Sequence, residues 1–326
     1  MTRVAVIGMG GTIAMAPSAS GGIIPSLGAG DLVASVPGLA DLDVELTATT
    51  LRSLPSPSLG FADLVALSDL VRAEIAGGAD GVVITHGTDT IEETAFFLDL
   101  TVAAAAPVVV TGAMRHPLAA GADGPANLYA AIRVATAPAA RDLGCLVVMS
   151  DEVHGARFVR KSHTHSTGAF VSPAFGPLGV VVEGDPRIRG AARVGLTVPA
   201  EPRVADLRVG LITVALGDEG ALLRRAGDLF DGIVIAGLGA GHVPAAMVPV
   251  VAEYAERVPV VLSTRTGAGS VLRATYGYPG SERDLLERGL IHAGFLDPAK
   301  ARILLQLLVA TGAAKPEIAG AFDRFR

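Results

Sequence analysis

The chain has 326 residues, which is enough for two domains or for one large domain. Half of its residues are hydrophobic, yet only 4% are aromatic and tryptophan is absent, so the core must be aliphatic. Such a composition is typical of parallel sheets whose strands are buried on both faces. The net charge is -6 and acidic and basic residues are interspersed, which argues against a nucleic-acid partner.

Cysteine usage and apolar runs narrow the class of protein further. Cys145 is the single cysteine, so an intrachain disulfide is excluded, and its apolar surroundings favour a buried structural thiol. No histidine–cysteine cluster has the spacing of metal ligands, and we expect neither a metal nor a cofactor. No apolar run reaches the roughly 18 residues that span a bilayer, and a strand pattern begins at residue 3 without a preceding signal peptide. We therefore expect a cytoplasmic protein with no membrane partner.

In the first half of the chain, strand-like apolar runs alternate with segments whose apolar residues recur at helical spacing. The runs that predict strands are residues 3–8, 44–50, 81–85, 107–111 and 144–149. The segments that predict helices are residues 61–76, 90–100 and 124–135. This alternation predicts an α/β domain with a doubly wound sheet. In such a sheet, ligands bind beyond the carboxyl ends of the strands.

The alternation is interrupted after residue 183, where the chain is charged and carries Pro186, Pro199 and Pro202. We interpret residues 186–207 as a linker between an N-terminal catalytic domain, residues 1–185, and a C-terminal α/β domain, residues 208–326. In the second domain, strands are predicted at residues 209–215, 232–235 and 258–262. Helices are predicted there at residues 220–226, 244–257, 298–311 and 315–325.

Two glycine-rich turns that carry threonine follow strands of the first domain. One reads Gly-Met-Gly-Gly-Thr-Ile-Ala at residues 8–14, and the other reads Thr-His-Gly-Thr-Asp-Thr at residues 85–90. Glycine lets the backbone approach a ligand, free amides can stabilise an oxyanion, and a hydroxyl beside them is placed to attack. The first turn lacks both the dinucleotide fingerprint and the lysine of a phosphate-binding loop. Taken alone, each turn is more often structural, but their common position beyond one sheet favours an active site.

Neighbouring residues allow structural as well as functional interpretations. Asp89 suits a helix cap, and the acidic residues that follow it suit a first helical turn. We expect His86 to pack inside the second turn and to orient it. Lys161 is one of only three lysines in a chain that otherwise uses arginine. A buried lysine can lose its proton, whereas arginine cannot, so Lys161 is a candidate base.

These motifs resemble the two signatures of bacterial-type L-asparaginases, the asparaginase/glutaminase family. Besides the two threonine turns, the matching segments are Glu-Glu-Thr-Ala at 92–95, Gly-Ala-Met-Arg at 112–115, Ala-Asp-Gly-Pro-Ala-Asn-Leu at 122–128 and Lys-Ala-Arg at 300–302. The similarity runs from Val4 to the C-terminal helices. It implies a flavodoxin-like doubly wound N-terminal domain and a smaller α/β C-terminal domain. It also implies a homo-oligomer, a dimer or tetramer, whose active sites are shared between subunits.

The resemblance further implies hydrolysis of L-asparagine to L-aspartate and ammonia through a threonine acyl-enzyme. Thr12 would be the nucleophile, and a second triad would consist of Thr88, Asp89 and Lys161, with the lysine as a base. The choice between the two threonines as the first attacker stays open. The substrate-binding residues that the resemblance implies are Gly11, Ser56, Gly87, Ala113, His242 and Glu282.

Three positions depart from the family pattern. Many members carry a tyrosine on a lid that follows the nucleophile, whereas this chain has no tyrosine before Tyr129. Pro57 stands where a glutamine often helps to bind the substrate, and His242 stands where an asparagine often supports the α-amino group. These departures leave two alternatives open. One is an amidohydrolase for another small ω-amide or a D-isomer, and the other is a catalytically weak amino-acid-binding homologue.

Overall fold

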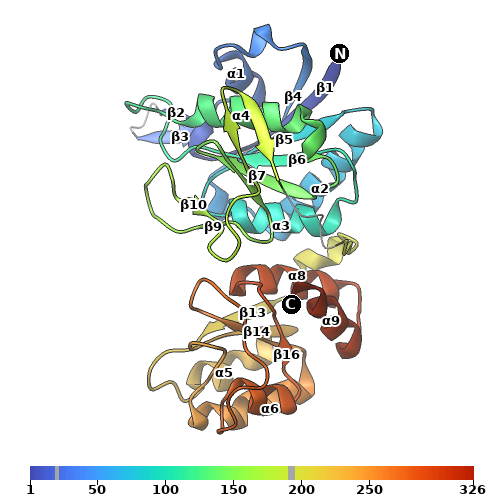
Figure 1. Ribbon diagram of the computed structural model, residues 1–326. Coiled ribbons are helices and arrows are strands. Elements are labelled where there is room, and N and C mark those ends of the chain that lie inside the picture. Colours follow the sequence, from blue (N-terminus) through green and yellow to red (C-terminus); the bar gives the residue numbers. More distant parts are fainter. Residues whose placement is uncertain (19–21, 190–194) are drawn as a thin grey trace. The chain divides into compact units, whose positions relative to one another are not determined.

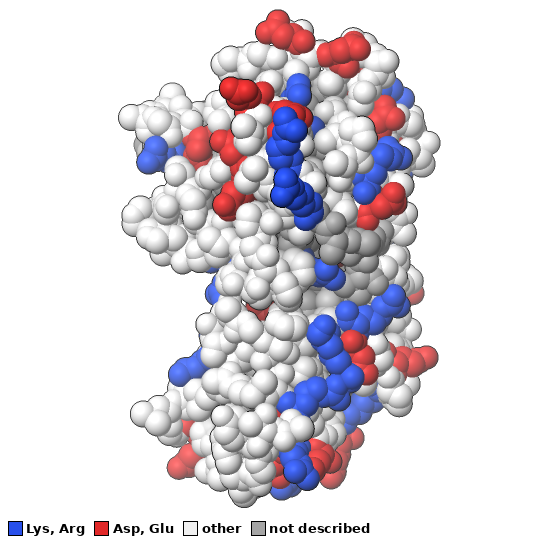
Figure 2. Space-filling view, in the orientation of Figure 1, with Lys and Arg blue, Asp and Glu red and all other residues white. Residues whose placement is uncertain are grey.

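The computed structural model describes residues 1–18, 22–189 and 195–326 of the chain (Figure 1). The chain forms two compact units, Met1–Thr197 and Val198–Arg326. On the face shown in Figure 2, acidic and basic side chains both occur over each unit. Within the described ranges, none of the helices combines the length and the apolar character that crossing a bilayer requires.

The first unit is built on an eight-stranded sheet with the order β12-β11-β8-β7-β6-β5-β1-β4. Five of its strands run parallel: β1 (Thr2–Gly10), β4 (Val44–Leu54), β5 (Gly81–Thr85), β6 (Val108–Thr111) and β7 (Cys145–Met149). Numbered in chain order, these five have the spatial order 2-1-3-4-5 of flavodoxin-like folds. The order reverses at β1, so the loops after β1 and β5 flank the topological switch point, where such folds bind ligands.

The alternation of side chains along β1 explains why helices cover both faces of this sheet. Val4 and Val6 belong to the core that includes α1 (Ala29–Ala34) and α4 (Gly124–Thr136). Ala5 and Ile7 belong to the core on the opposite face, which includes α2 (Phe61–Ala76) and α3 (Ile91–Thr101). Both cores are mainly aliphatic, as the composition predicts.

Three further strands extend the sheet beyond β7: β8 (Glu152–Gly155), β11 (Gly179–Val182) and β12 (Asp185–Ile188). Each is antiparallel to the strand before it in the sheet. β12 therefore reaches into the segment predicted as a linker, residues 186–207. The division between the two units falls later in that segment, between Thr197 and Val198. Residues 190–194 of the same segment lie outside the described residues.

Two short hairpins of the first unit lie outside the main sheet. β2 (Met15–Pro17) pairs with β3 (Ile23–Pro25), and β9 (Arg160–Lys161) pairs with β10 (Phe170–Val171). The first hairpin holds the segment in which the family's tyrosine is missing, and residues 19–21 of it lie outside the described residues. The second hairpin carries Lys161 and therefore bears on the candidate site.

The second unit contains a four-stranded parallel sheet with the order β13-β14-β15-β16. The strands are β13 (Val209–Thr213), β14 (Gly232–Gly237), β15 (Val260–Thr264) and β16 (Ile291–His292). Its helices are α5 (Ala221–Ala226), α6 (Val248–Arg257), α7 (Glu282–Glu287), α8 (Pro298–Ala310) and α9 (Lys315–Phe322). The sequence pattern does not predict β16 or α7, because both are too short for a measurable period.

Candidate active site

The turns that follow β1 and β5 touch through their backbones. Thr12 opens the short 3-10 helix after β1, and Gly11 precedes it at φ +81°. A methyl group built on Gly11 would lie 2.2 Å from the Cα of Gly87, far inside van der Waals contact. Glycine permits both this backbone conformation and this close approach. Thr12 and Thr88 therefore belong to turns that lie against each other.

Replacing Gly11 with alanine should force these turns apart. The added methyl group would meet backbone atoms, which cannot swing aside, and the positive φ adds strain. We expect unfolding to become easier by about 3 kcal/mol or more, with loss of activity. Gly269→Ala is the matched control, because Gly269 has φ +85° but open space around it. Urea denaturation measures both variants, and equal midpoints would contradict the close contact.

A third segment joins the two turns after β4. Ser56 opens another 3-10 helix, Ser56–Ser58, and is 2% exposed. A methyl group on Gly87 would lie 2.6 Å from Ser56 Oγ, so this hydroxyl lies directly over the second turn. Thr90 Oγ1 also donates to the Ser56 carbonyl oxygen at 3.3 Å. Three of the residues expected to bind substrate, Gly11, Ser56 and Gly87, thus lie together.

A hydroxyl, an amine and a carboxylate are hydrogen-bonded at the second turn. Lys161 Nζ donates to Thr88 Oγ1 at 2.9 Å and to Asp89 Oδ1 at 2.6 Å. Thr88 is 6% exposed, whereas the Asp89 side chain is 59% exposed. The Asp89 carboxylate thus holds the Lys161 amine against the buried Thr88 hydroxyl. The exposed part of the same carboxylate is open to a ligand. An amine in this position can exchange a proton with the hydroxyl.

Lys161 is itself placed by a hairpin and by one carboxylate. It pairs with Phe170 across β9 and β10, and its backbone N–H donates to Glu92 Oε2 at 2.9 Å. Glu92 lies in the first turn of α3, just after the second threonine turn. From the sequence, Glu92 is only a favourable charge at a helix start, because its partner is 69 positions away. The structure shows that Glu92 fixes the strand that presents Lys161.

His86 holds the second turn from inside. Its Nδ1 lies 2.8 Å from the Gly87 carbonyl oxygen, and its Nε2 lies 3.1 Å from Thr94 Oγ1. A carbonyl oxygen only accepts, so Nδ1 carries the hydrogen and Nε2 accepts from the threonine. Burial lowers the pKa of His86 to about 4, so the ring is neutral at pH 7. This neutral ring orients the turn, as the sequence predicts.

The loop after β6 brings Ala113 to the same place. Asp123 accepts from two backbone N–H groups of this loop at 2.9 and 2.8 Å. Asn127 donates to the Gly112 carbonyl oxygen and to Asp123, each at 3.0 Å. A methyl group on Gly112 would lie 2.5 Å from the His86 carbonyl oxygen, so the loop lies against the second turn. Ala113 is fully buried between these supports.

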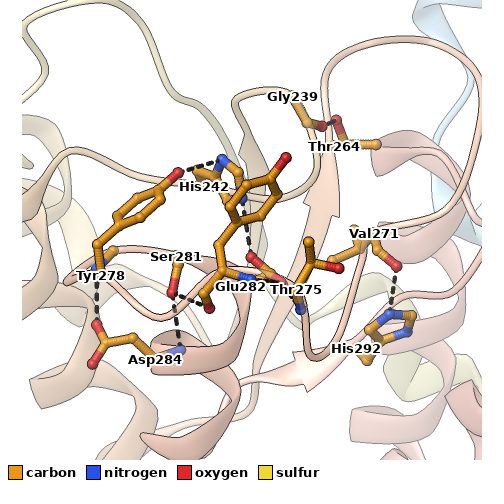
Figure 3. A network of polar contacts seen from close by, with 12 residues as sticks. Gly239, His242, Thr264, Val271, Thr275, Tyr278, Ser281, Glu282, Asp284 and His292 are labelled. Atoms are coloured by element: carbon orange, nitrogen blue, oxygen red, sulfur yellow. Dashed lines mark hydrogen bonds and ion pairs between the residues drawn. The ribbon is translucent and has the colours of Figure 1, made fainter.

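The two remaining predicted residues lie in the second unit and contact each other. His242 Nε2 is 3.0 Å from Glu282 Oε2 (Figure 3). The other oxygen of Glu282 accepts from the backbone N–H groups of Thr275 and Tyr276, each at 2.9 Å. Burial acts to raise the pKa of Glu282, but these hydrogen bonds outweigh it and hold the pKa below its ordinary value. Glu282 is therefore a charged carboxylate at neutral pH.

The first unit brings two threonine turns, an amine and a carboxylate together. Two threonine turns meet at the switch point, and the hydroxyl of Thr88 contacts the amine of Lys161. Within the described residues, no group of three or more histidine, cysteine, aspartate or glutamate side chains is arranged to hold a metal ion. The fold and this constellation place the chain among α/β enzymes with a hydroxyl–amine site.

Comparison with known proteins identifies the family. The family model described as asparaginase, N-terminal, matches residues 3–193, and the glutaminase/asparaginase C-terminal domain matches residues 208–322. A probable L-asparaginase of Deinococcus radiodurans is 40% identical over 327 residues, which cover 99% of this chain and 98% of that protein. An L-asparaginase of Bacillus licheniformis is 34% identical over 95% of this chain and 96% of its own.

The comparison of structures agrees with the comparison of sequences. The crystal structure of a probable cytoplasmic L-asparaginase from Campylobacter jejuni has a TM-score of 0.86 and 32% identity, and 99% of each chain is covered. The chain belongs to the asparaginase family and is an amidohydrolase. These findings confirm the family resemblance and the predicted fold class, a doubly wound first domain with a smaller α/β second domain.

Proposed function

We propose that the protein hydrolyses the side-chain amide of L-asparagine to L-aspartate and ammonia through a threonine acyl-enzyme. The hydrogen bonds from Lys161 to Thr88 and Asp89 carry this proposal, because they place beside a hydroxyl an amine that accepts a proton in its neutral form. The backbone contact between Gly11 and Gly87 supports it, since the turn that bears Thr12 lies against the same site.

In the proposed reaction, the Thr12 oxygen attacks the amide carbon while its proton passes through the Thr88 hydroxyl to Lys161. The backbone N–H of Thr88 stabilises the tetrahedral oxyanion, whereas the N–H of Gly11 is occupied by the Leu54 carbonyl oxygen at 3.0 Å. Lys161 then returns a proton to the leaving nitrogen, the C–N bond breaks, and ammonia departs. Water attacks the resulting ester along the same proton path, which releases aspartate and restores the Thr12 hydroxyl.

Other groups at the site orient the substrate in this proposal. Ser56 binds the α-carboxylate, Asp89 accepts from the α-amino group, and the Ala113 carbonyl oxygen accepts from the leaving nitrogen. The exposure of Asp89 supports its role, because a charged partner must reach it from solvent. The position of Ser56 over Gly87 supports the contact between Ser56 and the α-carboxylate. Both charged groups of one small substrate must be held at once, and Ser56 lies beside the turn that carries Asp89.

A second candidate is hydrolysis of another small ω-amide or of a D-isomer, and Pro57 favours it. Pro57 lies exposed beside Ser56 and has neither a backbone N–H nor a side-chain amide. It therefore cannot make the hydrogen bonds that a glutamine offers at this place. Loss of one orienting contact weakens the preference for one amide length or one stereoisomer.

Ammonia release from L-asparagine, L-glutamine and D-asparagine distinguishes the two candidates. We expect L-asparagine to rank first, because Ser56 and Asp89 would hold both ends of its α-carbon. One extra methylene changes transition-state binding by about 1–3 kcal/mol, so L-glutamine should follow about 10- to 200-fold lower in kcat/KM. A higher rank for another amide would reject L-asparagine and support the second candidate.

We also propose that the protein is a homo-oligomer, a dimer or tetramer, in which His242 and Glu282 complete the active site of a partner subunit. The family resemblance implies this arrangement, and the hydrogen-bonded His242–Glu282 pair supports it. We expect protein of monomer mass to be nearly inactive. Light scattering combined with ammonia assays over a dilution series measures both quantities. Full activity at monomer mass would contradict the shared site.

We place the protein in the cytoplasm as a further proposal. Its support is the description of the Campylobacter jejuni relative as probably cytoplasmic. Fractionation of the host cell with an antibody against the chain tests it, and recovery from the periplasm or the medium would contradict it.

A further inference from the structure

A pocket of the first unit, the Ile13 pocket, opens beside the candidate active site. Its volume is about 90 Å³, and its lining includes Ile13, Leu27, Leu32, Val36, Ala113 and Leu128. Leu32 lies in α1 and Leu128 lies in α4, so two helices contribute to its wall. Ser35, Arg115 and Pro117 also line the pocket, and they are exposed, so they mark its mouth. A ligand can therefore reach this pocket from solvent.

The interior of the Ile13 pocket is suited to an aliphatic group. Ile13, Ala113 and Leu128 are at most 3% exposed and present only carbon atoms from their side chains. The hydroxyl of Ser35 donates to the Leu32 carbonyl oxygen at 2.7 Å, so its hydrogen is occupied within the protein. Apolar cavities of this kind take up apolar molecules, and one of about 150 Å³ holds a benzene ring. The smaller Ile13 pocket therefore fits a chain of about four carbons.

The charge at the mouth of the pocket favours an anion. Arg115 Nη1 donates to the Gly121 carbonyl oxygen at 2.9 Å, which holds the guanidinium in place. Asp123 accepts from the backbone N–H of Arg115 at 2.8 Å, and within the described residues no carboxylate forms an ion pair with the guanidinium itself. Arginine binds carboxylates through paired, charge-assisted hydrogen bonds. An arginine beside an apolar pocket therefore matches a carboxylate that carries an apolar tail.

We propose that the Ile13 pocket binds a short-chain aliphatic monocarboxylate, with its chain inside the pocket and its carboxylate on Arg115. The pocket is distinct from the residues proposed to hold the amide substrate, and the proposal does not depend on which amide is hydrolysed. An amino acid is a poor ligand for it. Its ammonium group would lie either among aliphatic side chains, where a charge is costly to bury, or beside the like charge of Arg115.

The Ile13 pocket and the candidate active site share two loops. Ile13 directly follows Thr12 in the 3-10 helix after β1, and Ala113 belongs to the loop after β6. Gly124 lines the pocket as well, and a methyl group built on it would lie 3.0 Å from Ile13 Cγ1 and 3.4 Å from Ala113 Cβ. A bound aliphatic chain therefore packs against the residue next to the proposed nucleophile and against the proposed acceptor of the leaving nitrogen.

Titration of the full-length protein with pentanoate, followed by NMR of the ligand, tests the proposal. Pentanoate extends acetate by a short aliphatic chain and should bind about 50-fold more tightly, because the added methylenes are buried. Pentylammonium has the same chain with the opposite charge and should bind more weakly than pentanoate. Arg115→Gln should weaken pentanoate roughly tenfold or more, since a charge-assisted contact is lost. Gly124→Ala should weaken it several-fold, because the new methyl group takes up space in the pocket.

Two further variants identify where pentanoate binds. Arg141→Gln is the matched control, because Arg141 is an exposed arginine of the same unit outside the pocket lining. Ser56→Ala removes the hydroxyl proposed for the substrate carboxylate, and both variants should bind pentanoate as the wild type does. Weakening by Ser56→Ala but not by Arg115→Gln would place pentanoate in the active site and overturn the proposal. Equal affinities for pentanoate and acetate would also overturn it, and melting temperatures check that each variant is folded.

Discussion

Replacing Lys161 with alanine should lower kcat by about 100- to 10,000-fold, the usual effect of losing a positioned acid–base group. Lys161 Nζ is the nitrogen that contacts Thr88 Oγ1, at 2.9 Å, and its loss interrupts the proposed proton path. The fold should persist, because the Asp89 side chain is 59% exposed and water can replace its ion pair. Initial rates of ammonia release measure kcat, and circular dichroism reports on the fold.

Lys161→Arg separates proton transfer from charge. Arginine keeps a cation beside Asp89 but does not release its proton, so this variant should be about as inactive as Lys161→Ala. Recovery of most activity with arginine would show that Lys161 acts only through its charge. Lys315→Ala is the matched control, since the Lys315 amine donates to the Ala255 carbonyl oxygen in the second unit. That variant should keep wild-type turnover.

The first sheet is predictable where its strands are long, apolar and buried. The runs at residues 81–85 and 144–149 become β5 and β7, which are buried along their whole length. The pattern does not predict β8, β11 and β12, because each has four residues and they are partly exposed. Charged residues such as Glu152 and Arg187 also obscure their apolar alternation. Their pairing depends on the free edge of β7, which is a tertiary constraint.

Some residues of the candidate site are predictable from their neighbours in the sequence, whereas others are recognised only by contacts with distant parts of the chain. Thr12, Thr88 and Asp89 stand in glycine-rich turns directly after strands, so the local sequence predicts where they lie. Glu92 and Tyr278 make their contacts across 69 and 36 positions of the chain. Locally, the first looks like a charge at a helix start and the second like an exposed loop aromatic. Only the fold shows that they hold Lys161 and His242.

Replacing Thr12 with alanine should reduce turnover of L-asparagine by about 1,000-fold or more, because the oxygen proposed to form the acyl-enzyme is lost. Thr12→Ser keeps a hydroxyl on the same backbone and should retain a substantial part of the activity. Thr12 is partly exposed at the start of its 3-10 helix, so neither change should unfold the turn. Ammonia assays of both variants, with melting temperatures as a check on folding, measure the difference.

The site of acylation distinguishes the roles of the two threonines. Lys161 contacts Thr88 directly, so loss of activity in Thr88→Ala is expected whether Thr88 attacks or only passes a proton. Acid quenching during turnover, followed by trypsin and mass spectrometry, locates the acyl group. Cleavage after arginine places Thr12 in residues 4–52 and Thr88 in residues 73–115, so the two peptides are distinct. The acyl group should be found on the first peptide. An acyl group on the second would reverse the roles and make Lys161 the direct activator of the attacking hydroxyl.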